Sequence, residues 1–259
     1  MWKHVNRVLS WLILLFMLAP IIIIFLNSFN SSRFFSFPPD GFTLEWYRRF
    51  LENNEYRKAI GISTELAFSA VILALSVGIP SAYALFKWDS SKRSILQAVF
   101  LSPLMLPGIV WAIGLIQYYS MMGLLGSFIG LVCAHAIIII PYVIRLVTAS
   151  LCYLDEDTEH AARTLGATPV KTFFSVTLPA IKPGIIISGI FGFMISFTDV
   201  VIATFIAGSK YITYPVRMYV ELRTEGLDPL AVAVSAAIMF VIIIIALLAE
   251  KSLSWSKYL

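Results

Sequence analysis

"LDEDTEHAARTLGATPVKTFFSVTLPAIKPGI", residues 154–185, is the least apolar stretch in the C-terminal half of the chain. It opens with acids and a threonine, which start helices because carboxylates favour the positive end of the helix dipole. Gly166 then stops or bends this helix. Ala162 and Gly166 lie four residues apart, so they share a face that has almost no side-chain bulk. The stretch predicts a short helix on which another protein can dock, although an ordinary loop helix would show the same features.

Long apolar runs flank this stretch on both sides. A helix needs about 20 apolar residues to cross a bilayer core, and hydropathy marks about six such runs. They cover residues 8–25, 59–86, 95–119, 127–149, 183–207 and 230–249. The first is interpreted as an uncleaved span, because it is long for a signal peptide and no A-x-A site follows it. We expect an all-α, polytopic helical bundle that forms a single domain over residues 1–259.

The composition agrees with a membrane protein. Of 259 residues, 59% are hydrophobic and 13% are charged, whereas soluble domains carry about 25% charged residues. A net charge of +4 would also suit a nucleic-acid binder. The basic residues, however, form short clusters between apolar runs, as membrane topology requires. The expected partner surface is therefore the lipid bilayer, and no nucleic acid is expected.

Charges in the loops predict the orientation. With six crossings, the loops after spans two, four and six fall on the same side of the membrane as the N-terminus. These loops carry the basic residues Lys87, Lys92, Arg93, Arg163, Lys171, Lys182, Lys251 and Lys257. This places both termini in the cytoplasm, with a cytoplasmic loop at about 152–182 and an external loop at about 29–58. The external loop carries basic residues too, among acids, and its residues 43–60 predict an amphipathic surface helix.

Residues 160–179 resemble the EAA loop of bacterial binding-protein-dependent ABC permeases. That pattern is E-A-A, three residues, Gly, nine residues, Ile, one residue and Leu-Pro. The matching positions are Ala161, Ala162, Gly166, Val176, Leu178 and Pro179. His160 occupies the position of the Glu, and Glu159 stands one residue earlier, which rotates its carboxylate by about 100° around the helix.

The resemblance implies a MetI-like, type I importer fold in a bacterial inner membrane. It also implies that the loop forms a coupling helix in a cleft of the ATPase subunit. The residues expected to make this contact are Glu159, His160, Ala161, Ala162, Gly166 and Ala167. The implied partners are two copies of an ATP-binding cassette ATPase, a second permease subunit and an external solute-binding protein.

The rest of the chain points to the solute. "FNSSRF", "GFTLEWYRRF" and "SFTDVVIATFIAG…YPVRMY…GLDP" are similar to the second permease subunit of spermidine/putrescine importers. A polyamine-like or otherwise cationic solute is therefore expected. Related subfamilies import ferric iron, thiamine, amino-alkyl phosphonates or amino acid-like compounds, and these remain alternatives.

The chain lacks the motifs of an enzyme. It has no G-x-x-x-x-G-K-[ST] phosphate loop, so ATP and Mg²⁺ are expected in the partner ATPase and no cofactor in this chain. H-E-x-x-H and G-x-S-x-G are also missing. Cys133, His135 and Cys152 are too scattered to predict a metal site. A self-sufficient secondary transporter is the alternative, and it predicts uptake without an ATPase.

Several polar residues fall within the apolar runs. Asp199 in span five is a candidate pathway acid for a cationic solute, or a structural carboxylate satisfied by Thr198, by backbone donors or by a charge on a partner subunit. Thr198 beside it is a further pathway candidate. Glu65 is a second pathway candidate, or an interfacial acid. Tyr118 lines the pathway or belongs to the interfacial aromatic belt. His135 is interpreted as a polar residue of helix packing.

Overall fold

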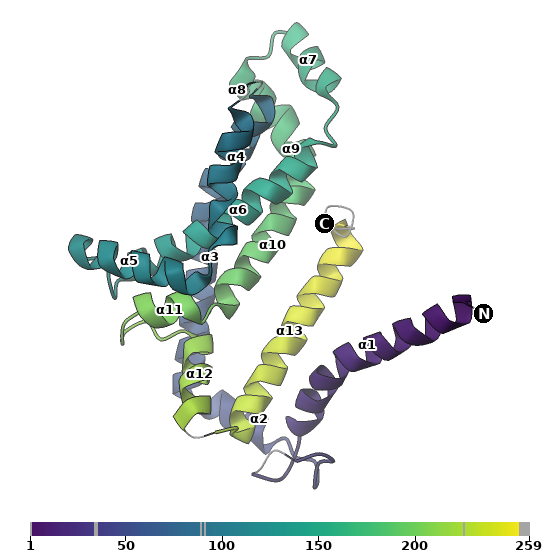
Figure 1. Ribbon diagram of the computed structural model, residues 1–259, viewed down its shortest axis with the longest axis vertical. Coiled ribbons are helices and arrows are strands. Elements are labelled where there is room, and N and C mark those ends of the chain that lie inside the picture. Colours follow the sequence, from purple (N-terminus) through teal and green to yellow (C-terminus); the bar gives the residue numbers. More distant parts are fainter. Residues whose placement is uncertain (1, 34–35, 89, 91, 225, 254–259) are drawn as a thin grey trace. The chain divides into compact units, whose positions relative to one another are not determined.

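The computed structural model describes residues 2–33, 36–88, 90, 92–224 and 226–253, and these residues form helices and connecting turns without a strand (Figure 1). An antiparallel bridge joins Asn30 to Phe42. The helices are α1 (Trp2–Asn27), α2 (Glu45–Glu52), α3 (Asn54–Lys87), α4 (Arg93–Leu101), η1 (Ser102–Met105), α5 (Gly108–Met122), α6 (Phe128–Leu151), α7 (Glu156–Thr164), α8 (Pro169–Thr172), η2 (Phe173–Thr177), α9 (Leu178–Ala180), α10 (Lys182–Thr198), α11 (Val201–Ile206), α12 (Tyr214–Thr224) and α13 (Pro229–Leu253). Lys257, used above for orientation, lies outside the described residues.

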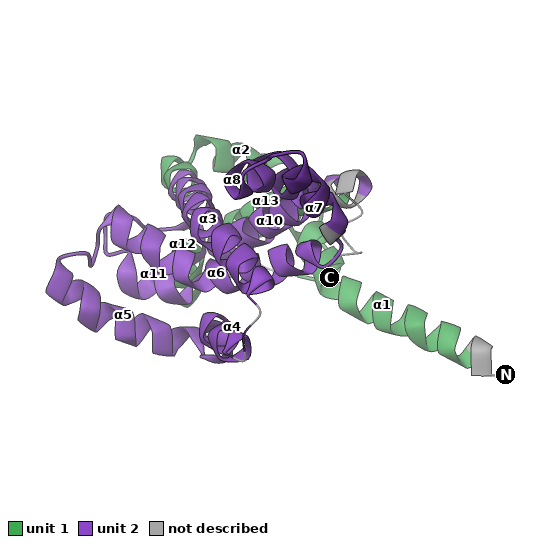
Figure 2. Ribbon diagram, turned by 90° about the horizontal axis from the view of Figure 1, so that it is seen from above, with its two compact units in different colours: residues 1–58, 217–247 green, residues 59–216, 248–259 purple. Residues whose placement is uncertain are grey.

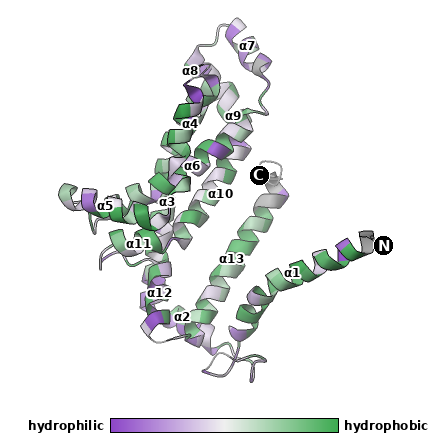
Figure 3. Cartoon of the chain, in the orientation of Figure 1, coloured by the Kyte–Doolittle hydropathy of each residue, from purple (hydrophilic) through white to green (hydrophobic). Residues whose placement is uncertain are grey.

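Four of these helices, α1, α3, α6 and α13, are long and apolar enough to cross a membrane. Two bent pairs raise the number of candidate spans to six: 93–105 with 108–122, and 169–180 with 182–198. Figure 3 shows hydrophobic residues along α1 and α13, and hydrophilic residues on α7. The prediction of an all-α bundle with about six spans is confirmed.

The apolar runs predicted as spans three and five do not form single straight helices. The third span bends by 99° between η1 and α5. Leu106 is extended there, with ψ 134°, because a residue before a proline avoids the helical region. The fifth predicted run, 183–207, stops at Thr198, and Asp199 is extended at φ −69° and ψ 127° before α11 begins. Asp199 therefore lies in a break between two helices.

The external amphipathic helix predicted over 43–60 is also divided. Its first part is α2, and its second part is the start of the long α3. Asn53 separates the two because its side-chain oxygen accepts hydrogen bonds from the backbone N–H groups of Glu55 and Tyr56, at 3.0 and 3.1 Å. An Asn in this position starts a new helix, so α3 begins before the apolar run does.

The chain divides into two compact units (Figure 2): residues 1–58 with 217–247, and residues 59–216 with 248–259. In the first unit, the indole of Trp46 donates a hydrogen bond to the carbonyl of Asn30 at 2.7 Å. The guanidinium of Arg217 pairs with the carboxylates of Glu55 and Glu221 at 2.6 and 2.8 Å. These contacts order the segment that the loop charges predict to be external.

The second unit holds the apolar core and both candidate sites. Helix α10 packs along α6, and α11 packs against α5 and α6. Glycines on α3 and α10 allow a close approach to α6: a Cβ at Gly78 would lie 2.6 Å from Val143, and one at Gly192 would lie 2.7 Å from Ile139. Membrane helices associate through such small residues because lipid offers no hydrophobic gain for helix contact.

Candidate functional sites

Helix α7 forms where the acids and Gly166 predict a helix. Asp155 caps it, because its carboxylate accepts a hydrogen bond from the backbone N–H of Asp157 at 3.0 Å. The helix ends at Thr164, and Gly166 follows with φ +88°. This left-handed backbone suits glycine, and it lets the N–H of Ala167 reach the carbonyl of Ala162 at 3.1 Å. The predicted start and stop of this helix are confirmed.

Three of the six residues predicted to touch an ATPase are exposed in this chain. His160, Ala161 and Gly166 are exposed, whereas Ala162 and Ala167 are half-buried. Leu165 beside them is 88% exposed, and a Cβ at Gly166 would meet no atom within 4 Å. One face of α7 with its following turn is therefore smooth, partly apolar and open to a partner.

Glu159 differs from its neighbours, because it is 2% exposed. One carboxylate oxygen accepts a hydrogen bond from the hydroxyl of Thr177 in η2 at 2.5 Å. The other lies 3.1 Å from the ammonium of Lys87, the last residue of α3. Burial opposes ionisation of this carboxyl, but Thr177 and Lys87, with the nearby charge of Arg163, outweigh it and hold the pKa of Glu159 below its ordinary value. We call these three residues the Glu159 clamp.

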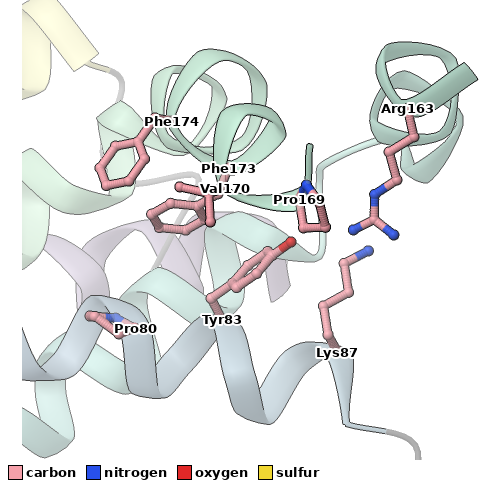
Figure 4. Close-up of a pocket in the computed structure, with 8 residues that line it drawn as sticks. All are labelled: Pro80, Tyr83, Lys87, Arg163, Pro169, Val170, Phe173 and Phe174. Atoms are coloured by element: carbon pink, nitrogen blue, oxygen red, sulfur yellow. The ribbon is translucent and has the colours of Figure 1, made fainter. Parts of the chain in front are cut away.

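A hollow of about 600 Å³ lies beside the clamp (Figure 4). Its walls are mainly aromatic and aliphatic: Pro80, Tyr83, Pro169, Val170, Phe173 and Phe174. Tyr83 of α3 packs on Phe173 of η2, with ring centroids 4.8 Å apart. Lys87 and Arg163 point toward one another at one end of the hollow. The end of α3 thus meets α7 through the clamp and η2 through an aromatic contact.

The second site surrounds Asp199. One oxygen of its carboxylate accepts a hydrogen bond from the backbone N–H of Ala203 at 2.9 Å. The same oxygen lies 3.8 Å from Nε2 of His135 on α6. Nδ1 of His135 lies 2.8 Å from the hydroxyl of Ser196, and the imidazole is fully buried. The Asp199 side chain is 15% exposed, so this polar cluster is open at its acidic end.

The other pathway candidates do not join this cluster. Thr198 donates its hydroxyl to the carbonyl of Met194 at 2.8 Å. Glu65 on α3 is exposed, and Tyr118 on α5 is 70% exposed. The backbone N–H of Ala203 donates to Asp199, whereas the hydroxyl of Thr198 bonds within its own helix. Both interpretations of Asp199, as a pathway acid and as a structural carboxylate, stay open.

The sequence did not reveal the partners of either carboxylate. His135 was assigned to helix packing, and its contact with Asp199 arises because α10 lies along α6. Lys87 is 72 residues before Glu159, and no spacing connects them. Thr177 lies inside the matched pattern but at a position where the pattern allows any residue. Only the fold brings these groups together.

A family model described as the inner membrane component of binding-protein-dependent transport systems matches residues 70–254. This range contains both sites and most of the chain. The chain belongs to this family. It is therefore a multi-pass inner-membrane permease, a transport subunit rather than an enzyme. As a permease of a binding-protein-dependent importer, it works with an ATPase and a solute-binding protein.

Relatives of this permease resemble it over most of their length. The spermidine/putrescine transport system permease protein PotC of Haemophilus influenzae is 31% identical over 227 residues, which cover 88% of this chain and 87% of that protein. The putrescine transport system permease protein PotI of Escherichia coli is 29% identical over 255 residues, covering 96% and 89%. The molybdenum transport system permease protein ModB of Haemophilus influenzae is 29% identical over 187 residues, covering 66% and 81%.

Solved structures support the fold. A bacterial ABC transporter involved in the import of the acidic polysaccharide alginate matches with a TM-score of 0.68 at 17% identity, covering 96% of each chain. An amino acid ABC transporter matches with a TM-score of 0.56 at 17% identity, covering 82% of this permease and 97% of that chain. The importer fold expected from residues 160–179 is confirmed.

Proposed function

We propose that this permease imports a polyamine or a similar organic cation across the inner membrane. The observation that carries the proposal is the Asp199 carboxylate, which lies at a helix break in the membrane region and stays 15% exposed. An acid in such a place is costly unless it has a function or a partner. Relatives that cover most of the chain are named for spermidine and putrescine.

The surroundings of Asp199 suit an ammonium group. The carboxylate takes a hydrogen bond from Ala203 and has the imidazole of His135 at 3.8 Å, which is beyond hydrogen-bond distance. It keeps lone pairs for a cationic donor, and the low dielectric of the site strengthens that attraction. An anion would be repelled by the same carboxylate. An anionic form of molybdenum, such as molybdate, is therefore disfavoured as the solute, although the molybdenum permease is also a relative.

The working assembly contains a second permease subunit, two ATPase copies and an external solute-binding protein. ATP and Mg²⁺ belong to the ATPase, because this chain has no phosphate loop. Both termini lie in the cytoplasm, as the loop charges indicate, so α7 faces the ATPase. Its exposed residues His160, Ala161 and Gly166, with Ala162 and Ala167, form the contact through which ATP binding moves the spans.

Uptake by whole cells tests the solute class. Cells that lack their own polyamine importers receive this permease with its partner genes and are given radiolabelled spermidine, putrescine or molybdate. We expect uptake of at least one polyamine and none of molybdate. Uptake of molybdate would overturn the assignment. So would polyamine uptake that an uncharged solute inhibits but that excess unlabelled polyamine does not.

A further inference from the structure

The position of Glu159 differs from the acid of the matched pattern by one residue. One residue corresponds to about 100° of rotation around a helix, and the structure shows its effect. His160, at the pattern's position, is exposed, whereas Glu159 points into its own chain and is 2% exposed. Among the described side chains of α7 it is the one that is buried. The acid is thus removed from the open face of the helix.

The two oxygens of Glu159 reach two different spans. Thr177, which donates to Oε1, lies in η2, within the 169–180 part of the bent pair that continues into α10. Lys87, whose ammonium lies 3.1 Å from Oε2, is the C-terminal residue of α3, a 34-residue helix. One carboxylate therefore joins the coupling helix to the inner ends of spans two and five.

The chemistry of this link makes it stiff. The carboxylate of Glu159 is nearly inaccessible to water. Removing Lys87 or Thr177 would therefore leave one of its buried oxygens without a hydrogen-bond donor, which is energetically costly. Charge-assisted hydrogen bonds at 2.5 and 3.1 Å hold both ends in a defined geometry. A rigid contact to two helices transmits a displacement to both. An exposed surface ion pair is weak and would break instead of transmitting the movement.

We propose that Glu159 is a positioning residue that passes movement of α7 to α3 and α10 through the clamp with Lys87 and Thr177. The inference rests on the proposed coupling of α7 to an ATPase. It assigns to this permease an internal connection between its ATPase-facing helix and its spans. Exposed Arg163 and Lys171, on α7 and α8, lie outside the clamp.

The test is the number of solute molecules imported per ATP hydrolysed by the purified, reconstituted complex. Glu159→Gln and Lys87→Met should assemble with the ATPase and keep basal ATP hydrolysis within about twofold, while the ratio falls about tenfold. The double variant should be no worse than either single variant, because each removes the same interaction. Lys87→Arg should restore most of the ratio, and Lys171→Met is the matched control that should leave it unchanged.

Three results would overturn the inference: an unchanged ratio in both single variants, additive losses in the double variant, or an equal loss in Lys171→Met. If the charge variants do not assemble, Thr177→Val decides, because it removes one hydrogen bond and keeps the ion pair. It should lower the ratio about threefold, and an unchanged ratio contradicts the clamp. If solute-loaded binding protein does not stimulate ATP hydrolysis by the wild-type complex, the proposed function is contradicted instead. Failure of the proposed function can therefore be distinguished from failure of the clamp.

Discussion

At the scale of single residues, two carboxylates have opposite environments. Glu159 is buried, and a hydroxyl and an ammonium satisfy its two oxygens. Asp199 is partly exposed, with the backbone N–H of Ala203 at 2.9 Å and the imidazole of His135 at 3.8 Å. The environment of Glu159 suits a structural role, and that of Asp199 leaves room for the cationic donor that the proposed function requires.

Asp199→Asn should raise the polyamine concentration needed for half-maximal uptake by about tenfold or more, since a hydrogen bond to a charged group contributes about 1.5–3 kcal/mol. The variant keeps a side-chain oxygen for the N–H of Ala203, so α11 should stay folded. Thr198→Val is the control, because that hydroxyl bonds within its own helix. Initial uptake rates at varied polyamine concentration provide the measurement. Unchanged half-saturation in Asp199→Asn would exclude a role in the pathway.

The ionisation of Glu159 predicts a pH dependence of stability. Its pKa is lowered in the folded chain from an ordinary value of 4.5, so its stabilising effect is present above that value and is lost as the pH falls through the folded pKa. Near neutral pH, wild type should melt at a higher temperature than Glu159→Gln in detergent. The difference should shrink below about pH 4.5. A difference that stays constant as the pH falls would contradict the charged state assigned to the clamp.

At the scale of elements, α7 was predictable because its information is local. Acids start it, a glycine ends it, and alanines leave one side smooth. Glu159 was not predictable, since its burial depends on where α3 and η2 end in space. The same applies to His135, which reaches Asp199 only because α6 and α10 are packed together.

The turn after α7 gives a test of the coupling contact. Gly166→Trp places a large ring in space that is open in this chain, where a partner is expected. The permease should insert in the membrane but lose ATP-driven uptake. Gly166→Asn is the matched control, because Asn tolerates the left-handed backbone at φ +88° without the bulk. Normal uptake by Gly166→Trp, or equal loss in both variants, would contradict a docking role for this turn.

Two glycines of α10 test the packing of α6 on α10. A Cβ at Gly192 would lie 2.7 Å from Ile139, whereas a Cβ at Gly189 would approach no atom closer than 3.8 Å. Gly192→Ala should therefore cost about 1–3 kcal/mol from overpacking, and Gly189→Ala should cost little. Thermal midpoints in detergent compare the two. A Gly192→Ala variant as stable as Gly189→Ala would show that the helices do not pack as closely as described.

At the scale of the whole molecule, apolar runs and one loop pattern were enough to predict the fold. Hydropathy identified about six spans, because each crossing helix must be apolar over its own length. It missed the bends in spans three and five, because a bend changes direction without changing hydropathy. The first bend lies at Leu106 and Pro107, and the second lies at Ile181. A separate break at Asp199 ends α10 within the apolar run 183–207. Prolines also lie inside α1, α3 and α6 without interrupting them, at Pro20, Pro80 and Pro141.

The dependence of transport on ATP tests the central claim most directly. The permease is reconstituted into liposomes alone, and in a complex with its second permease and ATPase subunits, with solute-loaded binding protein outside and ATP inside. We expect polyamine accumulation only in the complex, and only when ATP and binding protein are both present. Accumulation by the permease alone, or by the complex without ATP, would contradict the account and favour a self-sufficient transporter.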